Sequence, residues 1–359
     1  MFKNRNILIL VAVLAVLLAI NLWQKADHQR STSQSSTVKV IDATITADQL
    51  DRITLGQGDQ PEAVDLVATP TGWVVASAWD APASQQRIDA LLRSVSVLSG
   101  EFRSDSDEVL ADYSLSPETA VMIRAYDQAG EEVLALNVGS KPGNAPGSFI
   151  SRPGSSAVYL TPTNLLANLG LYDGPGVPEN KHFLDLLAVK TDRLAVDKIV
   201  LTEDGQAREL VKEFALETVA ATEEGGEPAA EAEEPSAGEP TLDRTTWEWK
   251  MTRPKAAALA KTKADGVLGS LTAVRAVDVD DPAVDPSAYG LDAPARTATL
   301  YLEDGTEKTL EFGKSREATD DLQAGVWMRE QGRPGIWVVT DYTIKNIFKP
   351  TEDLLPDQE

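Results

Sequence analysis

The sequence predicts an α+β protein in which an N-terminal transmembrane helix precedes two duplicated domains. Each domain is made of antiparallel strands and hairpins with one long and one short helix. Three observations predict this: an apolar run near the N-terminus, short β-branched and aromatic segments between glycines and prolines, and one order of motifs that occurs twice. Asp51 and its counterpart Asp197 lie more than a hundred residues apart, whereas solenoid repeats have a period of roughly 20–50 residues. The repeat is therefore a duplicated domain.

Residues 7–23 are predicted to be a membrane anchor. At 1.5 Å of rise per residue the run is about 25 Å long, which is short but sufficient to span a bilayer. Lys3 and Arg5 favour a cytoplasmic location for residues 1–6, so that the bulk of this single-pass chain is expected on the far side of the membrane. The alternative is a cleaved signal peptide, but the run ends at Trp23 rather than at small residues.

The composition narrows the classes of function. The chain has 56 acidic against 33 basic residues and a formal net charge of −23, which repels phosphate backbones and argues against nucleic-acid binding. It has no cysteine, which excludes disulfides, thiol nucleophiles and cysteine-ligated zinc. With 42% hydrophobic residues, two domains of ordinary size can be stabilised by their cores alone.

The first repeat is predicted at residues 48–171, after a Ser-, Thr- and Gln-rich flexible tether at 24–47. Strands are expected where β-branched and aromatic residues cluster, and the long helix where apolar residues recur at helical spacing from Ile88 to Leu98. The expected elements are strands at 52–55, 63–68 and 73–77, that helix, a hairpin of 119–126 with 133–138, strands at 148–151 and 157–160, and a closing helix at 162–169.

The second repeat is predicted at residues 194–348, after an inter-repeat linker at 172–193 and before a C-terminal tail at 349–359. It repeats the helix, the hairpin and the last strand pair in the same order. The recurring motifs are Asp51-Arg52-Ile53 with Asp197-Lys198-Ile199, Tyr113-Ser114-Leu115 with Tyr289-Gly290-Leu291, and Val138-Gly139 with Phe312-Gly313. On the same basis, Trp73 is expected to match Trp247, and Arg152 to match Arg329.

One segment of the second repeat, residues 217–244, has no counterpart in the first. It contains nine acidic residues, one basic residue and three prolines. Such a segment cannot bury enough surface to offset the entropy lost on ordering, so we expect a disordered acidic insert between two strands. It is expected to serve as a solubilising insertion. The alternative is that its negative charge attracts a basic partner.

Several short motifs resemble catalytic or phosphate-binding patterns but lack their partners. Residues 313–315 read Gly-Lys-Ser, yet the glycine required five positions before the first of them is Lys308. Residues 36–39 match Ser-x-x-Lys but lie in the tether. The only histidines, His28 and His182, are far apart and neither has an evident nucleophile. No catalytic, cofactor-binding or metal-binding residue is therefore assigned, and no cofactor is expected.

Two acidic clusters precede the tyrosine turns of the repeats. Their spacing lacks the central glycine and terminal glutamate of the usual calcium loop, so acidic turns are the favoured interpretation. The clusters are Asp105, Asp107, Glu108 and Asp112 in the first repeat, and Asp278, Asp280, Asp281 and Asp285 in the second.

The tryptophans offer the only candidate interaction surface. Equivalent placement in the two repeats indicates core packing for most of them, because aromatic side chains bury large areas. Trp79 and Trp249 have no evident equivalent. These two are therefore expected to be exposed and available to a ligand or partner.

The second repeat also resembles a known family. Its Tyr-Gly-Leu-x-x-Pro turn at 289–294, the hairpin that ends at Gly313 and the strands at 326–329 and 336–339 resemble a bacterial membrane-anchored family described only as a domain of unknown function and often repeated in one chain. Members accompany ABC-type transporter permeases and gliding-motility-type auxiliary proteins. The first repeat departs from the pattern at Ser114. The resemblance brings no catalytic residue with it.

Anchor, duplication and resemblance together predict a non-enzymatic periplasmic accessory or scaffold subunit of an ABC-type transport or envelope-related complex, with a permease or auxiliary subunit as partner. The alternative is a binding module for glycan or another envelope polymer that uses Trp79 or Trp249. An envelope hydrolase is the third and weakest hypothesis, because the duplication accounts for most candidate residues as scaffold.

Overall fold

The computed structural model describes residues 37–41, 45–143, 146–217, 241–319 and 322–357. These residues form two compact units: unit one contains the described residues up to 77 and 83–183, and unit two contains 78–82 and those from 184 onward. The predicted anchor at 7–23 lies outside the described residues. Within them, no helix is both long and apolar enough to cross a membrane.

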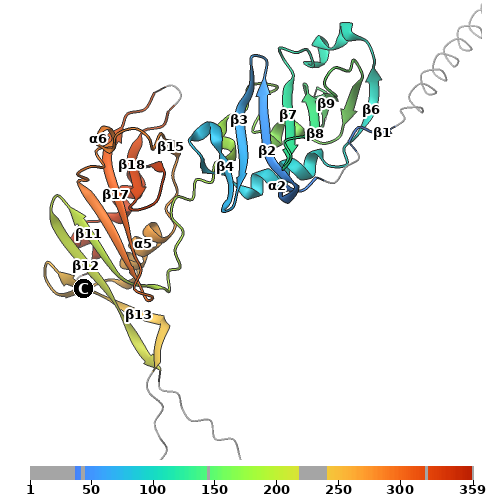
Figure 1. The fold of residues 1–359 in the computed structure, drawn as a ribbon. Helices are drawn as coiled ribbons and strands as arrows, with labels where there is room; N and C mark the ends of the chain where they lie inside the picture. Colours follow the sequence, from blue (N-terminus) through green and yellow to red (C-terminus); the bar gives the residue numbers. More distant parts are fainter. Residues whose placement is uncertain (1–36, 42–44, 144–145, 218–240, 320–321, 358–359) are drawn as a thin grey trace, which may run out of the picture. The chain divides into compact units, whose positions relative to one another are not determined.

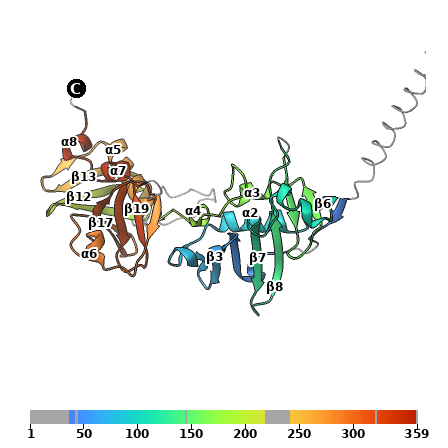
Figure 2. The same ribbon diagram turned by 90° about the horizontal axis from the view of Figure 1, so that it is seen from above.

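The first sheet has ten strands in the order β1-β6-β10-β9-β8-β7-β2-β3-β4-β5 (Figure 1). Its strands are β1 (Thr37–Lys39), β2 (Leu50–Gln57), β3 (Gln60–Thr69), β4 (Gly72–Val75), β5 (Ala81–Pro82), β6 (Ser99–Ser104), β7 (Val121–Asp127), β8 (Glu132–Val138), β9 (Ser148–Ser151) and β10 (Val158–Thr161). The helices are α2 (Gln85–Val95), α3 (Leu165–Asn168) and α4 (Asn180–Phe183), with 3₁₀ turns η1 (Ala47–Gln49), η2 (Ala76–Ala78), η3 (Asp107–Val109) and η4 (Ala111–Tyr113). Figure 2 shows α2 and α3 on one face of this sheet.

The second sheet has nine strands in the order β14-β13-β12-β11-β16-β17-β18-β19-β15. Its strands are β11 (Val196–Glu203), β12 (Gln206–Glu217), β13 (Thr241–Arg253), β14 (Ala257–Ala258), β15 (Asp278–Asp280), β16 (Arg296–Leu302), β17 (Glu307–Arg316), β18 (Gly325–Glu330) and β19 (Ile336–Val339). The helices are α5 (Lys261–Thr272), α6 (Pro286–Tyr289), α7 (Asp341–Ile347) and α8 (Thr351–Leu354). The helices α5, α7 and α8 cover one face (Figure 2).

The two units share one topology. The order β6-β10-β9-β8-β7-β2-β3-β4 in the first sheet is matched strand for strand by β15-β19-β18-β17-β16-β11-β12-β13 in the second, and α2 matches α5. All these pairings are antiparallel. The predicted α+β duplication is therefore confirmed, with more short helices than expected.

The long helix of each unit forms because apolar residues recur every three or four positions and face the sheet. In α2 these buried residues are Ile88, Leu91, Leu92 and Val95. In α5 they are Ala264, Val267, Leu268 and Leu271. The buried residues have the same spacing in both helices, so that α2 and α5 can be aligned residue by residue.

A glycine after β8 and another within β17 let the tyrosine turn approach the sheet closely. A Cβ on Gly139 would lie 2.1 Å from the Tyr113 carbonyl oxygen, and a Cβ on Gly313 would lie 2.1 Å from that of Tyr289. No larger residue fits, which explains both glycines as scaffold and removes the phosphate-loop interpretation. The next turn position is left-handed in both units, with φ of 56° at Ser114 and 69° at Gly290.

Several predicted boundaries are wrong. The end of the tether forms β1, which pairs with β6, and the tail forms α8, whose Leu354 is fully buried. The predicted linker contains α4 with buried Phe183. The closing helix is only the four residues of α3, capped by Asn164. In the tether, the tail and the linker the short elements were not predicted because a few apolar residues carry no periodicity, whereas the closing helix is shorter than predicted.

Two other sequence predictions need correction or narrowing. Strand pairing continues to Glu217 and Thr241 at the ends of β12 and β13, so the acidic insert is narrower than predicted; residues 218–240 lie outside the described residues. In the last strands Val138 pairs with Ile150 and Phe312 pairs with Met328. Arg329 therefore corresponds to Ser151, and its expected match to Arg152 is wrong by one residue.

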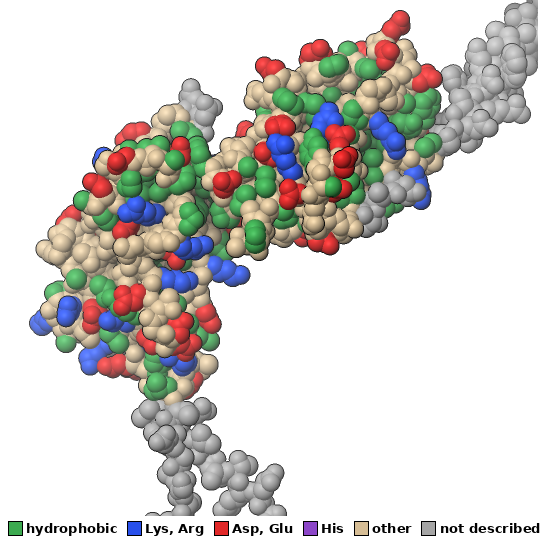
Figure 3. All heavy atoms as spheres, in the orientation of Figure 1, with side chains coloured by type: hydrophobic (Ala, Val, Ile, Leu, Met, Phe, Trp, Pro, Cys, Tyr) green, Lys and Arg blue, Asp and Glu red, His purple; other side chains and the backbone are tan. Residues whose placement is uncertain are grey.

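The surface of both units carries charges of both signs. On the face shown in Figure 3, Lys and Arg side chains lie among Asp and Glu side chains in each unit. Arg52 on β2, for example, pairs with Asp65 at 2.8 Å and Glu62 at 2.7 Å. Exposed pairs of this kind contribute little to stability, roughly 0–1 kcal/mol each, so the buried contacts described below matter more.

Candidate functional site

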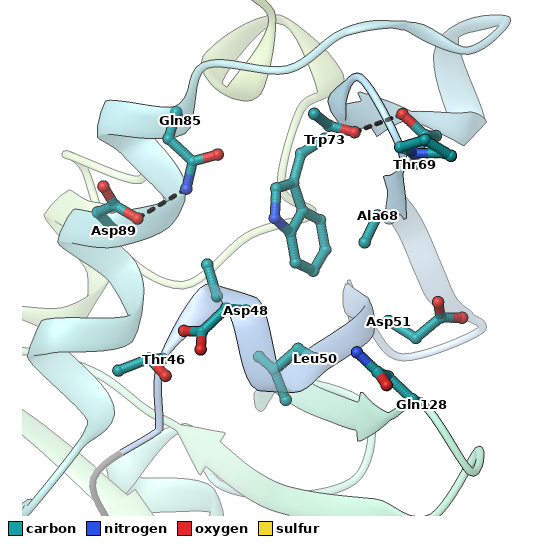
Figure 4. Close-up of a pocket in the computed structure, with 13 residues that line it drawn as sticks. Thr46, Asp48, Leu50, Asp51, Ala68, Thr69, Trp73, Gln85, Asp89 and Gln128 are labelled. Atoms are coloured by element: carbon teal, nitrogen blue, oxygen red, sulfur yellow. Dashed lines mark hydrogen bonds between the residues drawn. The ribbon is translucent and has the colours of Figure 1, made fainter.

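Unit one has an open pocket of about 800 Å³. Its walls come from the segment leading into β2, from the β3–β4 hairpin and from the first turns of α2 (Figure 4). Three carboxylates line it: Asp48, Asp51 and Asp89. No lysine or arginine is among the described residues that line it. The pocket is therefore an acidic cavity without an internal counter-charge.

The indole of Trp73 forms the centre of the pocket wall, with Ala68 on one side and α2 on the other (Figure 4). It is mostly buried, with 8% of its surface exposed. On α2, Gln85 Nε2 donates a hydrogen bond of 2.8 Å to Asp89 Oδ1. A hydrogen bond from Thr46 lowers the pKa of Asp48, so this carboxylate is ionised at neutral pH.

Strand registers identify the counterpart of this pocket in unit two. In unit one Ile53 pairs with Leu66, which pairs with Val75. In unit two Ile199 pairs with Leu210, which pairs with Met251. Trp73 lies two residues before Val75, and Trp249 lies two residues before Met251. Trp73 therefore corresponds to Trp249. The predicted match of Trp73 to Trp247 is therefore wrong.

The same registers match the polar positions. Asp51 and Asp197 both lie two residues before the paired isoleucine. Asp89 and Asp265 both lie two residues before the first leucine or valine of the matched helix motif. Ala68 then corresponds to Lys212, and Gln85 to Lys261.

Trp249 is buried, with 2% of its surface exposed, so its predicted exposure is wrong. Its Nε1 donates to Asp265 Oδ1 at 2.8 Å, and Trp247 Nε1 donates to the same oxygen at 3.1 Å. Lys261 Nζ lies 3.1 Å from Asp265 Oδ2. Burial by itself would raise the pKa of Asp265, but the hydrogen bonds from Trp249 and Lys261 hold it below its usual value.

Lys212 fills the centre of the site in unit two. The side chain is buried, with 4% of its surface exposed, and Nζ lies 4.1 Å from the centroid of the Trp247 ring. Nζ also donates a 2.6 Å hydrogen bond to the Arg193 carbonyl oxygen. Burial, reinforced by neighbouring Arg244, lowers the pKa of Lys212 to about 8, although Asp197 and Asp265 oppose this shift.

One substitution, Lys212 at the position of Ala68, and the length of the hairpin together explain why one site is filled and the other open. In unit one the β3–β4 hairpin closes at once, with Thr69 paired to Gly72. In unit two β12 and β13 continue to Glu217 and Thr241. The extension carries Arg244, which pairs with Asp197 and also lies 2.9 Å from Glu303.

Of the predicted interaction residues, only Trp79 is exposed. It follows η2, 47% of its surface is accessible, and both it and Asp80 have left-handed backbones with φ of 56° and 57°. The structure does not bring Trp79 and Trp249 into one surface, since Trp249 lies inside the filled site. Whether Trp79 binds a ligand stays a prediction.

The other residues singled out in the sequence take part in internal contacts. His182 is half-buried, its Nε2 lies 3.2 Å from the Asn168 carbonyl oxygen, and burial together with Arg87 lowers its pKa. Lys314 Nζ donates to the Ser287 carbonyl oxygen. His28 and Ser36 lie outside the described residues.

The acidic cluster of unit two also has internal partners. Asp278 pairs with Arg316 at 2.9 Å, while Asp280 accepts hydrogen bonds from Trp327 Nε1 at 2.9 Å and Tyr289 Oη at 3.3 Å. In the part of the chain that the structure describes, no group of three or more histidine, aspartate or glutamate side chains is placed to hold a metal ion. The cluster is a set of structural turns.

The pocket of unit one was missed by sequence reasoning, although Asp51 and Trp73 were each noted. The signal that could have revealed the pocket is that unit one has Ala68 and Gln85 where unit two has Lys212 and Lys261. This difference is visible only once the strand registers are known.

Comparison with known proteins agrees with these registers. A family model described as a domain of unknown function (DUF4340) matches residues 73–246 and 249–355. The two matches begin at Trp73 and Trp249, the same tryptophans that the strand registers make equivalent. Neither the curated proteins nor the solved structures yielded a match. The matched segments cover most of the sequence, and the chain belongs to the DUF4340 family.

Proposed function

We propose that this protein is a non-enzymatic accessory subunit that recognises a partner through unit one. The observation that carries the proposal is the difference between two copies of one fold. The site between the hairpin and the long helix is filled in unit two by Lys212 and Arg244, and is an open acidic pocket in unit one. A site that the chain fills in one copy and leaves open in the other is suited to receiving an external group.

The groups that the two units share support a scaffold. The tyrosine turn, the glycine that lets it approach the sheet and an aromatic pair occur in both units. The ring centroids of Tyr113 and Phe149 are 4.5 Å apart, and those of Tyr289 and Trp327 are 5.3 Å apart. These contacts are packing contacts. The two units differ in the basic residues at this site and in the length of the hairpin. These differences change which groups the site can bind.

The location and the type of complex are further parts of the proposal. Residues 7–23 would hold the chain in a bacterial inner membrane with both units in the periplasm. The partner would be an ABC-type permease or its auxiliary subunit, as the family resemblance implies. The complex would act in transport or on envelope material.

Site-specific photo-crosslinking in native membranes tests this proposal. A photoreactive residue at Gln128, on the pocket rim, should capture a membrane transport protein, identified by mass spectrometry. The matched control carries the same residue at Val133, an exposed position on β8, and should capture much less of it. Capture of nothing but other copies of this chain from Gln128 would overturn the proposal.

A second candidate function is binding of glycan or another envelope polymer, favoured by the exposed indole of Trp79. Titration with cell-wall fragments should then change the tryptophan fluorescence, and Trp79→Phe should remove the change. An unchanged spectrum at millimolar fragment concentration would exclude this function.

A further inference from the structure

We propose that α4, the last helix of unit one, acts as a pH-sensitive latch: protonation of His182 beside Arg87 loosens α4 from α2 and α3. Residue 184 already belongs to unit two, so release of α4 would lengthen the free chain that joins the two units. The latch depends neither on the pocket of unit one nor on the membrane location, and so goes beyond the proposed function.

The contacts that hold α4 in place reach other elements of unit one. Ser77 Oγ donates to Asn180 Oδ1 at 2.6 Å, and Asn180 Nδ2 donates to the Ser77 carbonyl oxygen at 3.1 Å. The Phe183 side chain is fully buried, and its carbonyl oxygen accepts a 2.7 Å hydrogen bond from the Ser84 N–H at the start of α2. A helix of four residues is not stable by itself in water, so α4 depends on these contacts.

His182 lies where α2, α3 and α4 meet. Its Nε2 is 3.2 Å from the Asn168 carbonyl oxygen at the end of α3 and 3.5 Å from Arg87 Nη1 on α2. The shorter contact is to an oxygen that can only accept, which assigns the proton of the neutral ring to Nε2. Gly170 packs against the ring, since a Cβ on this glycine would lie 2.7 Å from Nδ1. A second proton must bind Nδ1, and it makes the ring a cation beside the Arg87 guanidinium.

Burial and charge both oppose this second proton. Burial lowers the pKa of His182, Arg87 lowers it further, and the hydrogen bond to the Asn168 carbonyl oxygen opposes both. Once α4 is released, the imidazole returns toward its ordinary pKa of about 6.5. The released form therefore binds more protons. Docking has its full strength above about pH 6.5 and weakens as the pH falls through the lowered pKa.

The other charged groups around the ring do not offset Arg87. Asp89, the one carboxylate of α2, lines the pocket described above, and neither α3 nor η2 has an ionisable side chain. On α4 itself, Lys181 is a second cation next to His182 in the sequence. Glu179, just before the helix, is exposed to solvent.

Unit two contains the same docked helix. The Ala260 N–H donates to the Leu354 carbonyl oxygen, as the Ser84 N–H does to the Phe183 carbonyl oxygen. Leu354 and Phe183 are both fully buried. The helix α8 therefore corresponds to α4.

The two docked helices differ at the position of His182. The alignment of α2 with α5 matches Arg87 to Lys263, and the alignment of α4 with α8 matches His182 to Asp353. Lys263 and Asp353 line one pocket of unit two. Unit two thus has a carboxylate across this pocket from its basic residue, where unit one has an imidazole, the group whose charge changes between about pH 5 and 8.

Amide hydrogen exchange in the full-length protein tests the latch and contains its own control. The Ser84 amide reports docking of α4, and the Ala260 amide reports docking of α8. After correction for the intrinsic rate at each pH, protection of Ser84 should fall severalfold from about pH 8 to about pH 5, while that of Ala260 should stay constant. Equal changes at the two amides, or none at Ser84, would overturn the proposal.

Variants assign the pH dependence to this contact. His182→Gln retains a side-chain N–H for the Asn168 carbonyl oxygen but cannot titrate, so protection of Ser84 should no longer depend on pH. His182→Asp introduces the residue of unit two, and its attraction to Arg87 should keep Ser84 protected in acid. Arg87→Met should reduce the pH dependence, whereas Arg93→Met, at an α2 arginine that lines another pocket, should leave it unchanged. Full pH dependence in His182→Gln would contradict the latch.

Direct titration of the imidazole by NMR covers the case in which a substitution loosens α4 by itself. The chain has two histidines, so His28→Gln leaves the His182 signal alone. Its midpoint should lie below about pH 6.5 and should rise in Arg87→Met. A midpoint at or above this value would overturn the proposal, because docking would then favour the protonated ring.

Discussion

Unit one and unit two have the same strand order but differ in the length of a single hairpin. The β3–β4 hairpin of unit one turns at Thr69–Gly72, whereas β12 and β13 of unit two pair as far as Glu217 and Thr241. The extra length carries Arg244, which pairs with Asp197, and Trp247, which donates to Asp265, while Lys212 replaces Ala68 on the part of the hairpin that both units share. The shared fold supplies an acidic site, and one substitution together with the length of the hairpin determines whether this site is filled.

Shared interactions show how far the duplication extends beyond topology. Arg52 lies over the Tyr126 ring at 6.0 Å and pairs with Asp65. At the matching position Lys198 lies over the Tyr301 ring at 3.9 Å and approaches Glu209 at 3.9 Å. The basic residue is an arginine in unit one and a lysine in unit two, whereas its partners are a tyrosine ring and a carboxylate in both units.

The largest effect is expected where the two units are most alike. Gly139→Ala and Gly313→Ala should each lower the free energy of unfolding of their unit by about 3 kcal/mol, because a Cβ would lie 2.1 Å from a tyrosine carbonyl oxygen. Hydrogen exchange of β8 and β17 amides would report the two units separately.

Gly269→Ala in α5 is the matched control for these glycines. A Cβ there meets nothing within 4 Å, and alanine favours helix by about 1 kcal/mol, so this variant should be stabilised. Equal, small effects at Gly139 and Gly313 would contradict the close approach in both units.

The next effect separates the units by pH. Lys212 loses its proton near pH 8 in the folded protein and near 10.5, its ordinary value, in the unfolded chain. Between these values the unfolded chain binds more protons, so the free energy of unfolding of unit two should rise with pH, by at most about 3 kcal/mol. Lys212→Met should remove this rise, measured by urea denaturation at several pH values.

Lys250→Met, which removes a half-exposed lysine of β13, is the control and should retain the rise. The raised pKa of Tyr289, about 12, lowers stability above pH 10, but equally in all three proteins. A rise that persists in Lys212→Met would contradict the assignment to this lysine.

An intermediate effect is expected at the paired tryptophans. Trp249→Phe should cost about 2 kcal/mol, since it removes a buried hydrogen bond to Asp265 and leaves a gap in the filled site. Trp73→Phe should cost less than about 1 kcal/mol, because Trp73 borders an open pocket. Thermal unfolding monitored by hydrogen exchange would measure the loss of stability in each variant. Equal losses in the two variants would mean that the two sites are closed to the same degree.

The smallest effect concerns the left-handed turn position. Ser114→Gly should stabilise unit one by about 0.5 kcal/mol, because the relief of strain at φ 56° exceeds the added freedom of the unfolded chain. The reverse change, Gly290→Ser, should destabilise unit two, where a Cβ would also lie 2.7 Å from Lys314 Cγ. A loss of stability in Ser114→Gly would show that the serine has a favourable role at this turn.

Much of the fold could be predicted from the sequence, and the errors have specific causes. The long helices and hairpins carry periodic apolar residues, so α2, α5 and the β7–β8 and β16–β17 hairpins were all expected. β1 and α8 were missed because each is short and bound by contacts with distant residues, such as the pairing of Val38 with Gly100.

The tryptophan error has a different cause. Strand side chains alternate with a period of two, so Trp247 and Trp249 lie on the same face and either could match Trp73 by pattern alone. Only the hydrogen-bonded register distinguishes them. The same ambiguity made Trp249 appear unmatched and therefore exposed.

By itself the sequence determined that this protein is a duplicated α+β chain, because the motif order, the glycines and the apolar spacing are local features repeated along it. Only the tertiary structure decided that one copy carries an open acidic pocket and the other a buried lysine. Lys212, Arg244 and Asp265 lie on different elements, and what they do depends on strand register and hairpin length, which no local pattern records.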